Sequence, residues 1–317
     1  MFDDWIRISA ATPPLILMVA LLLEAFIPFP ARWKPSALVP ILERLVRRVH
    51  HQYASHQQQV ITGLLLPIVV IIPSLIASWS FRNLAPVSVM YDVLMLFWLL
   101  ESQSIREGLI VLKQLFLQKK VSLAKLHLRQ YVLRETQSLS EMGLCKAAIE
   151  MSILRMTSQW LTVGVIYLLL GIHGALFFRL IQLIAQSCNI KLAHNRLCGE
   201  ISTRLMQSMN MIALFVVLIL QLLLPKGFGA LKVCFKQFRL WPDLVSGLLL
   251  INLGVALQLG LGGPRIYQNQ KVRYPRIGAI KDPEPSRLMS GYRRIALIGW
   301  IFWTIIFSVD LWFHYAH

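Results

Sequence analysis

Charged residues are scarce in this sequence, and acidic residues are the scarcest of them. Only 15% of the 317 residues are charged while 56% are hydrophobic, and 32 lysines and arginines stand against 15 aspartates and glutamates. Such a chain has too little polar surface for an ordinary soluble domain, so its composition indicates a membrane protein. Nucleic acid is not the expected partner, because the basic residues lie in loops beside apolar segments, where lipid headgroups account for them.

Several motifs of soluble catalysis are also missing. The sequence has no G-x-x-x-x-G-K-[ST] phosphate loop, no G-x-G-x-x-G dinucleotide fingerprint, no G-x-S-x-G and no H-E-x-x-H. Its four cysteines show neither C-x-x-C spacing nor histidines at zinc-ligand intervals, so we expect reduced, structural thiols.

Long apolar runs predict an all-α polytopic membrane protein, a single integral membrane domain over residues 1–317 with about six transmembrane helices. The expected spans are 13–29, 60–79, 86–100, 205–225, 244–261 and 295–313. Amphipathic stretches at 38–49 and 226–241 predict helices at the membrane surface. Glu24 lies inside the first span, where a carboxylate is either functional or held by a polar helix contact.

The segment 158–178 is apolar and long enough to span, but Gly171, His173 and Gly174 interrupt it. If it spans, lysines and arginines divide almost evenly between the two sides of the membrane. If it is re-entrant or half-spanning, most of them collect on one side, as the positive-inside rule requires. We therefore predict the second arrangement, with 101–157 and 262–294 as the main cytoplasmic segments.

Two stretches could carry chemistry. Residues 259–278 read LGLGGPRIYQNQKVRYPRIG, in which glycines permit sharp turns and arginines offer cationic donors. Composition alone allows a connector that meets lipid headgroups or a loop that binds an anion. Residues 134–139 read RETQSL, and Thr136, Ser138 or Ser140 could cap a helix that begins near Glu141.

The glycine-rich loop resembles the L-G-G-P-x-x-Y-x-G-x-x-x-x-x-P-x-I-G signature of the cobalamin-biosynthesis membrane proteins of the adenosylcobinamide-phosphate synthase (CbiB/CobD) type. Residues 134–139 are similar to that family's R-D-T-x-x-L, and the AAIE of residues 147–150 is similar to its A-x-[IV]-E. Leu23 and Glu24, followed by Pro28 and Pro30, resemble its L-D-x-x-x-G-D-P stretch. The resemblance covers nearly the whole chain.

This resemblance implies a multi-pass protein of the bacterial inner membrane with a site facing the cytoplasm. The family's reaction joins aminopropanol or its phosphate to cobyric acid, an amide ligation expected to use ATP and magnesium. Carried over residue by residue, the catalytic candidates are Glu135 and Glu150, and the metal candidates are Glu24, Glu135 and Glu150. The candidates for binding phosphate or corrinoid are Arg134, Thr136, Arg204, Gly262, Gly263, Pro264, Arg265 and Tyr267.

The sequence also departs from the family where acidic residues are expected. LRMTSQ at residues 154–159 replaces E-N-x-x-D-G, QLIA at 182–185 replaces N-T-L-D, and TRLMQ at 203–207 replaces A-R-x-D-D. Magnesium prefers carboxylate oxygens, so these losses predict weakened or lost catalysis, with Mg and ATP as cofactors only if the chain is active. The alternative is a non-catalytic binding or signalling protein of the AmpE type. The expected partners are the lipid bilayer, a corrinoid or other anionic small molecule, and a second copy of the chain.

Overall fold

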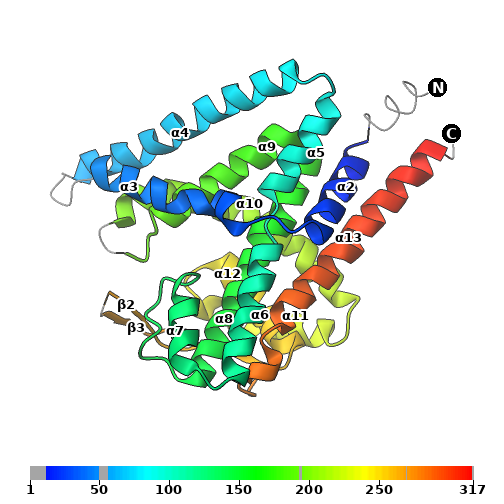
Figure 1. The fold of residues 1–317 in the computed structure, drawn as a ribbon. Helices are drawn as coiled ribbons and strands as arrows, with labels where there is room; N and C mark the ends of the chain where they lie inside the picture. Colours follow the sequence, from blue (N-terminus) through cyan, green and yellow to red (C-terminus); the bar gives the residue numbers. More distant parts are fainter. Residues whose placement is uncertain (1–11, 50–55, 193–194, 269, 316–317) are drawn as a thin grey trace. The chain divides into compact units, whose positions relative to one another are not determined.

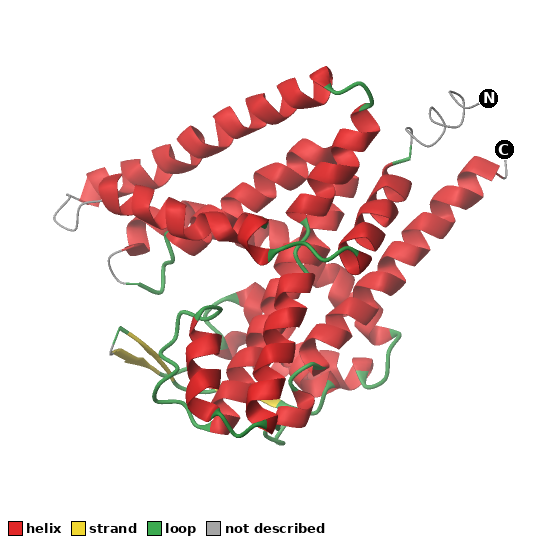
Figure 2. Cartoon of the chain, in the orientation of Figure 1, coloured by secondary structure: helices red, strands yellow, loops and turns green. Residues whose placement is uncertain are grey.

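The computed structural model describes residues 12–49, 56–192, 195–268 and 270–315, and it is helical with a few short strands (Figures 1 and 2). This confirms the all-α polytopic class. The chain forms two compact units, each assembled from segments far apart in the sequence. The first unit contains Met1–Gln103, Gln159–Asn210 and Trp303–His317, and the second contains Ser104–Ser158 and Met211–Phe302.

By length and composition, four helical runs are able to cross a membrane within the described residues. They are Gln57–Leu84, Glu141–Ser187, Arg196–Leu222 and Pro285–His314. Two shorter apolar helices, Pro13–Phe26 and Leu244–Ala256, coincide with the first and fifth expected spans. The number of six crossings stays a prediction. The expected span at 86–100 is represented by a helix of only 12 residues, Ser88–Leu99.

Helix α9 (Thr162–Ser187) is the centre of the first unit and is buried over most of its length. It packs against α2 (Pro13–Phe26), α3 (Val39–Val49), α4 (His56–Leu84) and α5 (Ser88–Leu99). The short turns η1 (Ala31–Trp33) and η2 (Pro35–Leu38) and the first part of α10 (Arg196–Leu222) belong to the same unit. A helix that is buried on nearly all sides needs no polar face, which explains why α9 shows little helical periodicity in its sequence.

The segment expected to be re-entrant is helical on both sides of Gly171. Helix α8 (Glu141–Met156) passes through a π-helical turn at Thr157–Leu161 into α9. The backbone leaves helical geometry at Gly171, where φ is 69° and ψ is −167°, a conformation that favours glycine. The sequence therefore indicated the position of the break correctly, and the re-entrant arrangement itself stays a prediction.

The second unit packs around α12 (Leu244–Ala256), which contacts α8 and α11 (Gly227–Gln237). The unit also contains α6 (Gln103–Leu117), α7 (Val121–Arg129), the second part of α10, η5 (Phe238–Leu240), η6 (Pro285–Arg287) and the start of α13 (Ser290–Tyr315). The glycine-rich loop, expected to be a connector or an anion-binding loop, contains four short strands: β1 (Gly260–Gly262), β2 (Arg265–Tyr267), β3 (Gln270–Val272) and β4 (Arg276–Gly278). Strands β1 and β4 pair antiparallel, as do β2 and β3.

Two glycines of α11 offer a direct test of how α11 packs against the end of α10. A Cβ added to Gly227 would lie 2.0 Å from the carbonyl oxygen of Gln221, whereas a Cβ on Gly229 would meet no atom within 4 Å. We expect Gly227→Ala to destabilise the protein by about 2 kcal/mol, because the backbone of the α10–α11 connection must move. Gly229→Ala should leave stability unchanged or raise it by about 0.5 kcal/mol, because alanine favours helix. Thermal unfolding in detergent, followed by tryptophan fluorescence, compares the two, and equal effects would contradict this packing.

Candidate functional site

Glu150 is the centre of the best-formed polar site in the second unit. It lies on α8, whose first turn is fixed by Ser140, because the Ser140 hydroxyl accepts a hydrogen bond from the Gly143 N–H at 3.2 Å. This cap confirms one of the three serine and threonine candidates. Two turns further along, the Glu150 side chain is buried and points to the glycine-rich loop.

Three donors hold the Glu150 carboxylate. Arg134 Nη2 and Arg265 Nη2 each donate to Oε2 at 3.0 Å, and the Gly262 N–H donates to Oε1 at 2.6 Å. All four residues are buried or part of a buried strand. We call Glu150, Arg134, Arg265 and Gly262 the Glu150 cluster. A buried carboxylate that accepts charge-assisted bonds on both oxygens is compensated for its loss of water.

Gly262 must be a glycine for two reasons. Its φ is 78°, and an added Cβ would lie 2.3 Å from the Pro275 carbonyl oxygen and 3.1 Å from the Trp241 ring. Gly262 can therefore lie close to Pro275 and Trp241, and in this position its N–H reaches Glu150. Gly263, with φ 103°, and Pro264 then connect β1 to β2.

Arg265 is held on more than one side. Its guanidinium lies 4.9 Å from the ring centre of Trp241 and 4.5 Å from that of Tyr274, in addition to its bond with Glu150. Stacking of a planar guanidinium on aromatic rings leaves its edge free for hydrogen bonding. Within the described residues, the buried Nε of Arg265 meets no hydrogen-bond acceptor.

The two arginines respond differently to the same carboxylate. Burial lowers the pKa of the Arg134 guanidinium below its ordinary value, despite the attraction of Glu150. Burial acts in the same direction on Arg265, but there the Glu150 carboxylate and the neighbouring tyrosines prevail and raise the pKa. Two guanidiniums thus face one carboxylate, and the cluster carries an excess of positive charge that suits an anion.

The remaining candidates in this unit support the cluster from nearby. The Glu135 N–H donates to the Ile266 carbonyl at 2.9 Å and so ties residues 134–136 to β2. Thr136 is buried and its hydroxyl donates to the Lys125 carbonyl at 2.9 Å. Tyr267 is buried at the end of β2. Among these residues, Glu135 is only half-buried.

Glu24 and Arg204 belong to the first unit. The Glu24 carboxylate accepts hydrogen bonds from the Ser102 N–H at 2.8 Å, the Ser102 hydroxyl at 2.6 Å and the Gln103 N–H at 2.9 Å, at the start of α6. The Glu24 carboxylate therefore makes a polar helix contact, and a functional role for it stays a prediction. The Arg204 side chain is exposed and pairs with Glu200, one helical turn away.

The residues present do not fit a magnesium site built on Glu24, Glu135 and Glu150. In the part of the chain that the structure describes, no group of three or more histidine, cysteine, aspartate or glutamate side chains could hold a metal ion. Glu24 and Glu150 also have both of their oxygens engaged by N–H or O–H donors. A hard dication needs several free oxygen ligands, and these two carboxylates offer none.

A second buried charge cluster in the first unit was missed by sequence reasoning. Glu101 accepts from Arg179 and from the Ser36 hydroxyl, and Arg179 also donates to Gln182. Lys34 is buried and donates to the carbonyls of Phe97 at 3.0 Å and Leu100 at 2.7 Å. Burial lowers the pKa of the Lys34 ammonium. The available signal was Arg179 itself, a cation inside an apolar run that needs a buried partner.

The Glu150 cluster yields a stability prediction. Glu150→Gln would leave Arg134 and Arg265 buried without a countercharge, so we expect a loss of about 3 kcal/mol or more in unfolding free energy. Glu141→Gln is the matched control, because Glu141 lies exposed in the first turn of the same helix and interacts mainly with the helix dipole. That variant should lose about 0.5 kcal/mol. Chemical unfolding in detergent measures both, and similar losses would contradict a structural role for Glu150.

The far end of the glycine-rich loop yields a pH prediction. Asp282 pairs with Lys146 of α8 at 2.8 Å and with Arg276 of β4 at 2.9 Å, and the hydrogen bond from Lys146 lowers the pKa of the Asp282 carboxyl below its ordinary 3.8. A lowered folded-state pKa stabilises the protein above the ordinary value and loses that effect as pH falls through the lowered one.

Asp282→Asn should therefore reduce the melting temperature slightly above about pH 5, with a difference that disappears below about pH 3. The effect should stay below about 1 kcal/mol, because the Asp282 side chain is 40% exposed. Lys146→Met serves as the control, since in its background the Asp282 substitution should change much less. A difference independent of pH would contradict the ion pair.

Comparison with known proteins identifies a family that this chain resembles over most of its length. The CobD/CbiB protein family model matches residues 17–295. The chain is 24% identical to a cobalamin biosynthesis protein CobD of Chromobacterium violaceum, over 85% of this chain and 88% of the relative. It is 23% identical to the protein of that name in Stutzerimonas stutzeri, over 84% and 87%. No solved structure matches. Because the family model spans most of its length, the chain belongs to the CobD/CbiB protein family.

Proposed function

We propose that this chain is a bacterial inner-membrane protein of corrinoid assembly whose site binds an anion and has weakened or lost ligase activity. Membership of the CobD/CbiB family supports a role in cobalamin biosynthesis. The observation that carries the rest is the state of Glu150. Both of its oxygens accept hydrogen bonds, from Arg134, Arg265 and Gly262, so the carboxylate organises the loop.

The chemistry of an ATP-dependent amide ligation supports this interpretation. Such a reaction needs phosphates clamped by cations and a metal ion held by carboxylates. The cationic half is present in Arg134 and Arg265, but the acidic half is depleted. In the stretch where the family has two acids, Arg155 of this chain donates to the Tyr131 carbonyl at 3.0 Å and lies over the Tyr131 ring.

An anion suits the cluster better than a cation does. Two guanidiniums outnumber the single carboxylate, and the Arg265 Nε meets no acceptor in the described part of the chain. Guanidinium groups bind carboxylates and phosphates with geometric specificity. A propionate of a corrinoid or the phosphate of aminopropanol phosphate has the required chemistry, and a cytoplasmic location of the loop would give either one access.

The alternative function is binding or signalling without any role in corrinoid assembly, as in AmpE-type proteins. The Glu24 and Glu150 carboxylates, whose oxygens all accept hydrogen bonds, also favour this alternative. A site that no longer catalyses the ligation is free to bind a different anion. The two functions share an anion site and differ in the anion that it selects.

The test combines turnover and binding on the full chain in detergent. With ATP, Mg²⁺, adenosylcobyric acid and aminopropanol phosphate, we expect no adenosylcobinamide phosphate beyond background while an active synthase control forms it. Turnover at a rate near that of the control would contradict the loss of catalysis. Adenosylcobyric acid should nevertheless bind, as measured by a shift in its absorption spectrum, and failure to bind it would favour the alternative.

Binding should depend on Arg265. Arg265→Met should weaken binding of adenosylcobyric acid by about tenfold or more, because a charge-assisted contact is lost. Arg276→Met is the matched control, since Arg276 lies in the same loop but is exposed and pairs with Asp282. It should leave the affinity unchanged. Equal losses in both variants would show that the general charge of the loop, and not this cluster, attracts the ligand.

A further inference from the structure

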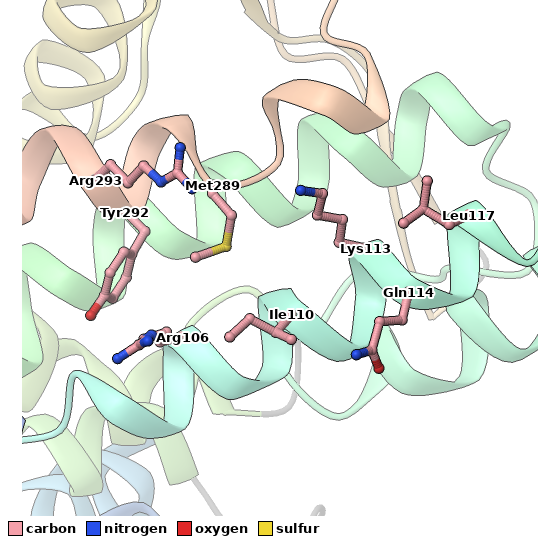
Figure 3. A pocket seen from close by; sticks show the side chains of 8 residues that line it. All are labelled: Arg106, Ile110, Lys113, Gln114, Leu117, Met289, Tyr292 and Arg293. Carbon is pink, nitrogen blue, oxygen red and sulfur yellow. The ribbon is translucent and has the colours of Figure 1, made fainter. Parts of the chain in front are cut away.

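A groove of about 440 Å³ lies in the second unit between α6 and the start of α13, apart from the Glu150 cluster. Figure 3 shows its side chains, which come from α6, from α13 and from Met289 just before α13. Three are cations: Arg106 and Lys113 on α6, and Arg293 on α13. Three are apolar: Ile110 and Leu117 on α6, and Met289 just before α13.

The spacing of α6 explains why these side chains face outward together. Positions 106, 110, 113 and 117 recur every three or four residues and share one helical face. The other face carries the buried Ile105, Leu109, Leu112 and Phe116. The groove face is therefore not a part of the core, and packing does not account for its composition.

Its charges are unbalanced. No carboxylate lines the groove, and in the described part of the chain the side chains of Arg106, Lys113 and Arg293 make no ion pair or hydrogen bond with another residue. Other basic residues of the same unit do have partners: Arg134 and Arg265 have Glu150, and Lys146 has Asp282. Three like charges around one groove repel each other, and an anion between them would remove that repulsion.

The apolar side chains narrow the choice of anion. Leu117 is 75% exposed and Ile110 is 37% exposed, beside the cations and not covered by another described element. A soluble phosphate ester would use the cations and leave these side chains in water. A ligand with a phosphate and a hydrocarbon part would use both.

The position of α13 points to the membrane as the source of that ligand. The groove includes Met289, Tyr292 and Arg293, at the beginning of the apolar run Pro285–His314 that is long enough to cross a bilayer. The first turns of such a helix lie at the level of lipid headgroups, where basic residues meet anionic lipid.

We propose that this groove binds the phosphate headgroup of an anionic phospholipid. Arg106, Lys113 and Arg293 contact the phosphate, and Ile110, Leu117 and Met289 contact the glycerol and the upper part of an acyl chain. The site thereby fixes α6 against the start of α13 within the second unit.

The principal experiment measures binding of fluorescent phosphatidylglycerol and phosphatidylcholine to the full chain in neutral detergent micelles. Phosphatidylglycerol should bind more tightly than phosphatidylcholine. Replacing Arg106, Lys113 and Arg293 together by glutamine should weaken phosphatidylglycerol on the order of a hundredfold, about fivefold for each cation. A lack of preference for the anionic lipid would overturn the proposal.

The matched control removes the same charge elsewhere in the unit, by glutamine at Lys119, Lys120 and Arg129, which are exposed and do not line the groove. Its affinity for phosphatidylglycerol should be unchanged. An equal loss of affinity in both triple variants would show that the net charge of the protein attracts the lipid, and it would overturn the groove as a binding site. Melting temperatures of both variants check that they are folded, and the single Arg293→Gln variant keeps the test valid if the triple variant is not.

A second comparison separates a lipid from a soluble phosphate. Leu117→Ser should weaken phosphatidylglycerol but leave the binding of glycerol 3-phosphate unchanged. Glycerol 3-phosphate should displace the lipid only at much higher concentration, because it lacks the hydrocarbon part. If glycerol 3-phosphate binds as tightly as the lipid and Leu117→Ser changes neither, the groove binds a soluble phosphate and the lipid assignment is wrong.

Discussion

A carboxylate buried between two guanidiniums and a backbone N–H organises the second unit. Glu150 connects the segment before α8, through Arg134, to the glycine-rich loop more than a hundred residues later, through Arg265 and Gly262. Together the three donors compensate the desolvation of the Glu150 carboxylate. The shape of the glycine-rich loop therefore depends on the contacts of Glu150. These contacts in turn require the positive φ of Gly262, the stacking of Arg265 and the two short strand pairs.

Much of this arrangement could be predicted from the sequence, but in separate pieces. Apolar runs predicted the membrane fold, Ser140 was among the three candidate caps, and Gly171 marked the break in α9. Residues 134, 150, 262 and 265 were also selected as site residues through the resemblance to the family. Their contact could not be predicted, because it depends on how α8 and α12 pack and on a backbone turn at Gly262, neither of which has a periodic signal.

Other features were missed for physical reasons. The strands of residues 260–278 are three residues long, too short to show alternation. Lys34 was not singled out from the sequence, yet its ammonium is buried and donates to two carbonyls at the end of α5. Glu24 was a metal candidate through its place in the family pattern. Its oxygens are instead engaged at the start of α6, a backbone contact that a list of side chains does not reveal.

Glu24 and Lys34 together have a consequence for the direction of the chain. One places a carboxylate at the N–H groups that begin α6, and the other places an ammonium at the carbonyls that end α5, so each charge matches the local helix dipole. At the break between the two helices, residues 100–102, the charge beside the incoming helix therefore differs from the charge beside the outgoing one. With the two charges exchanged, both would face groups of their own sign. The order of an acid and a base ten residues apart thus matches the direction in which the polypeptide leaves α5 and enters α6.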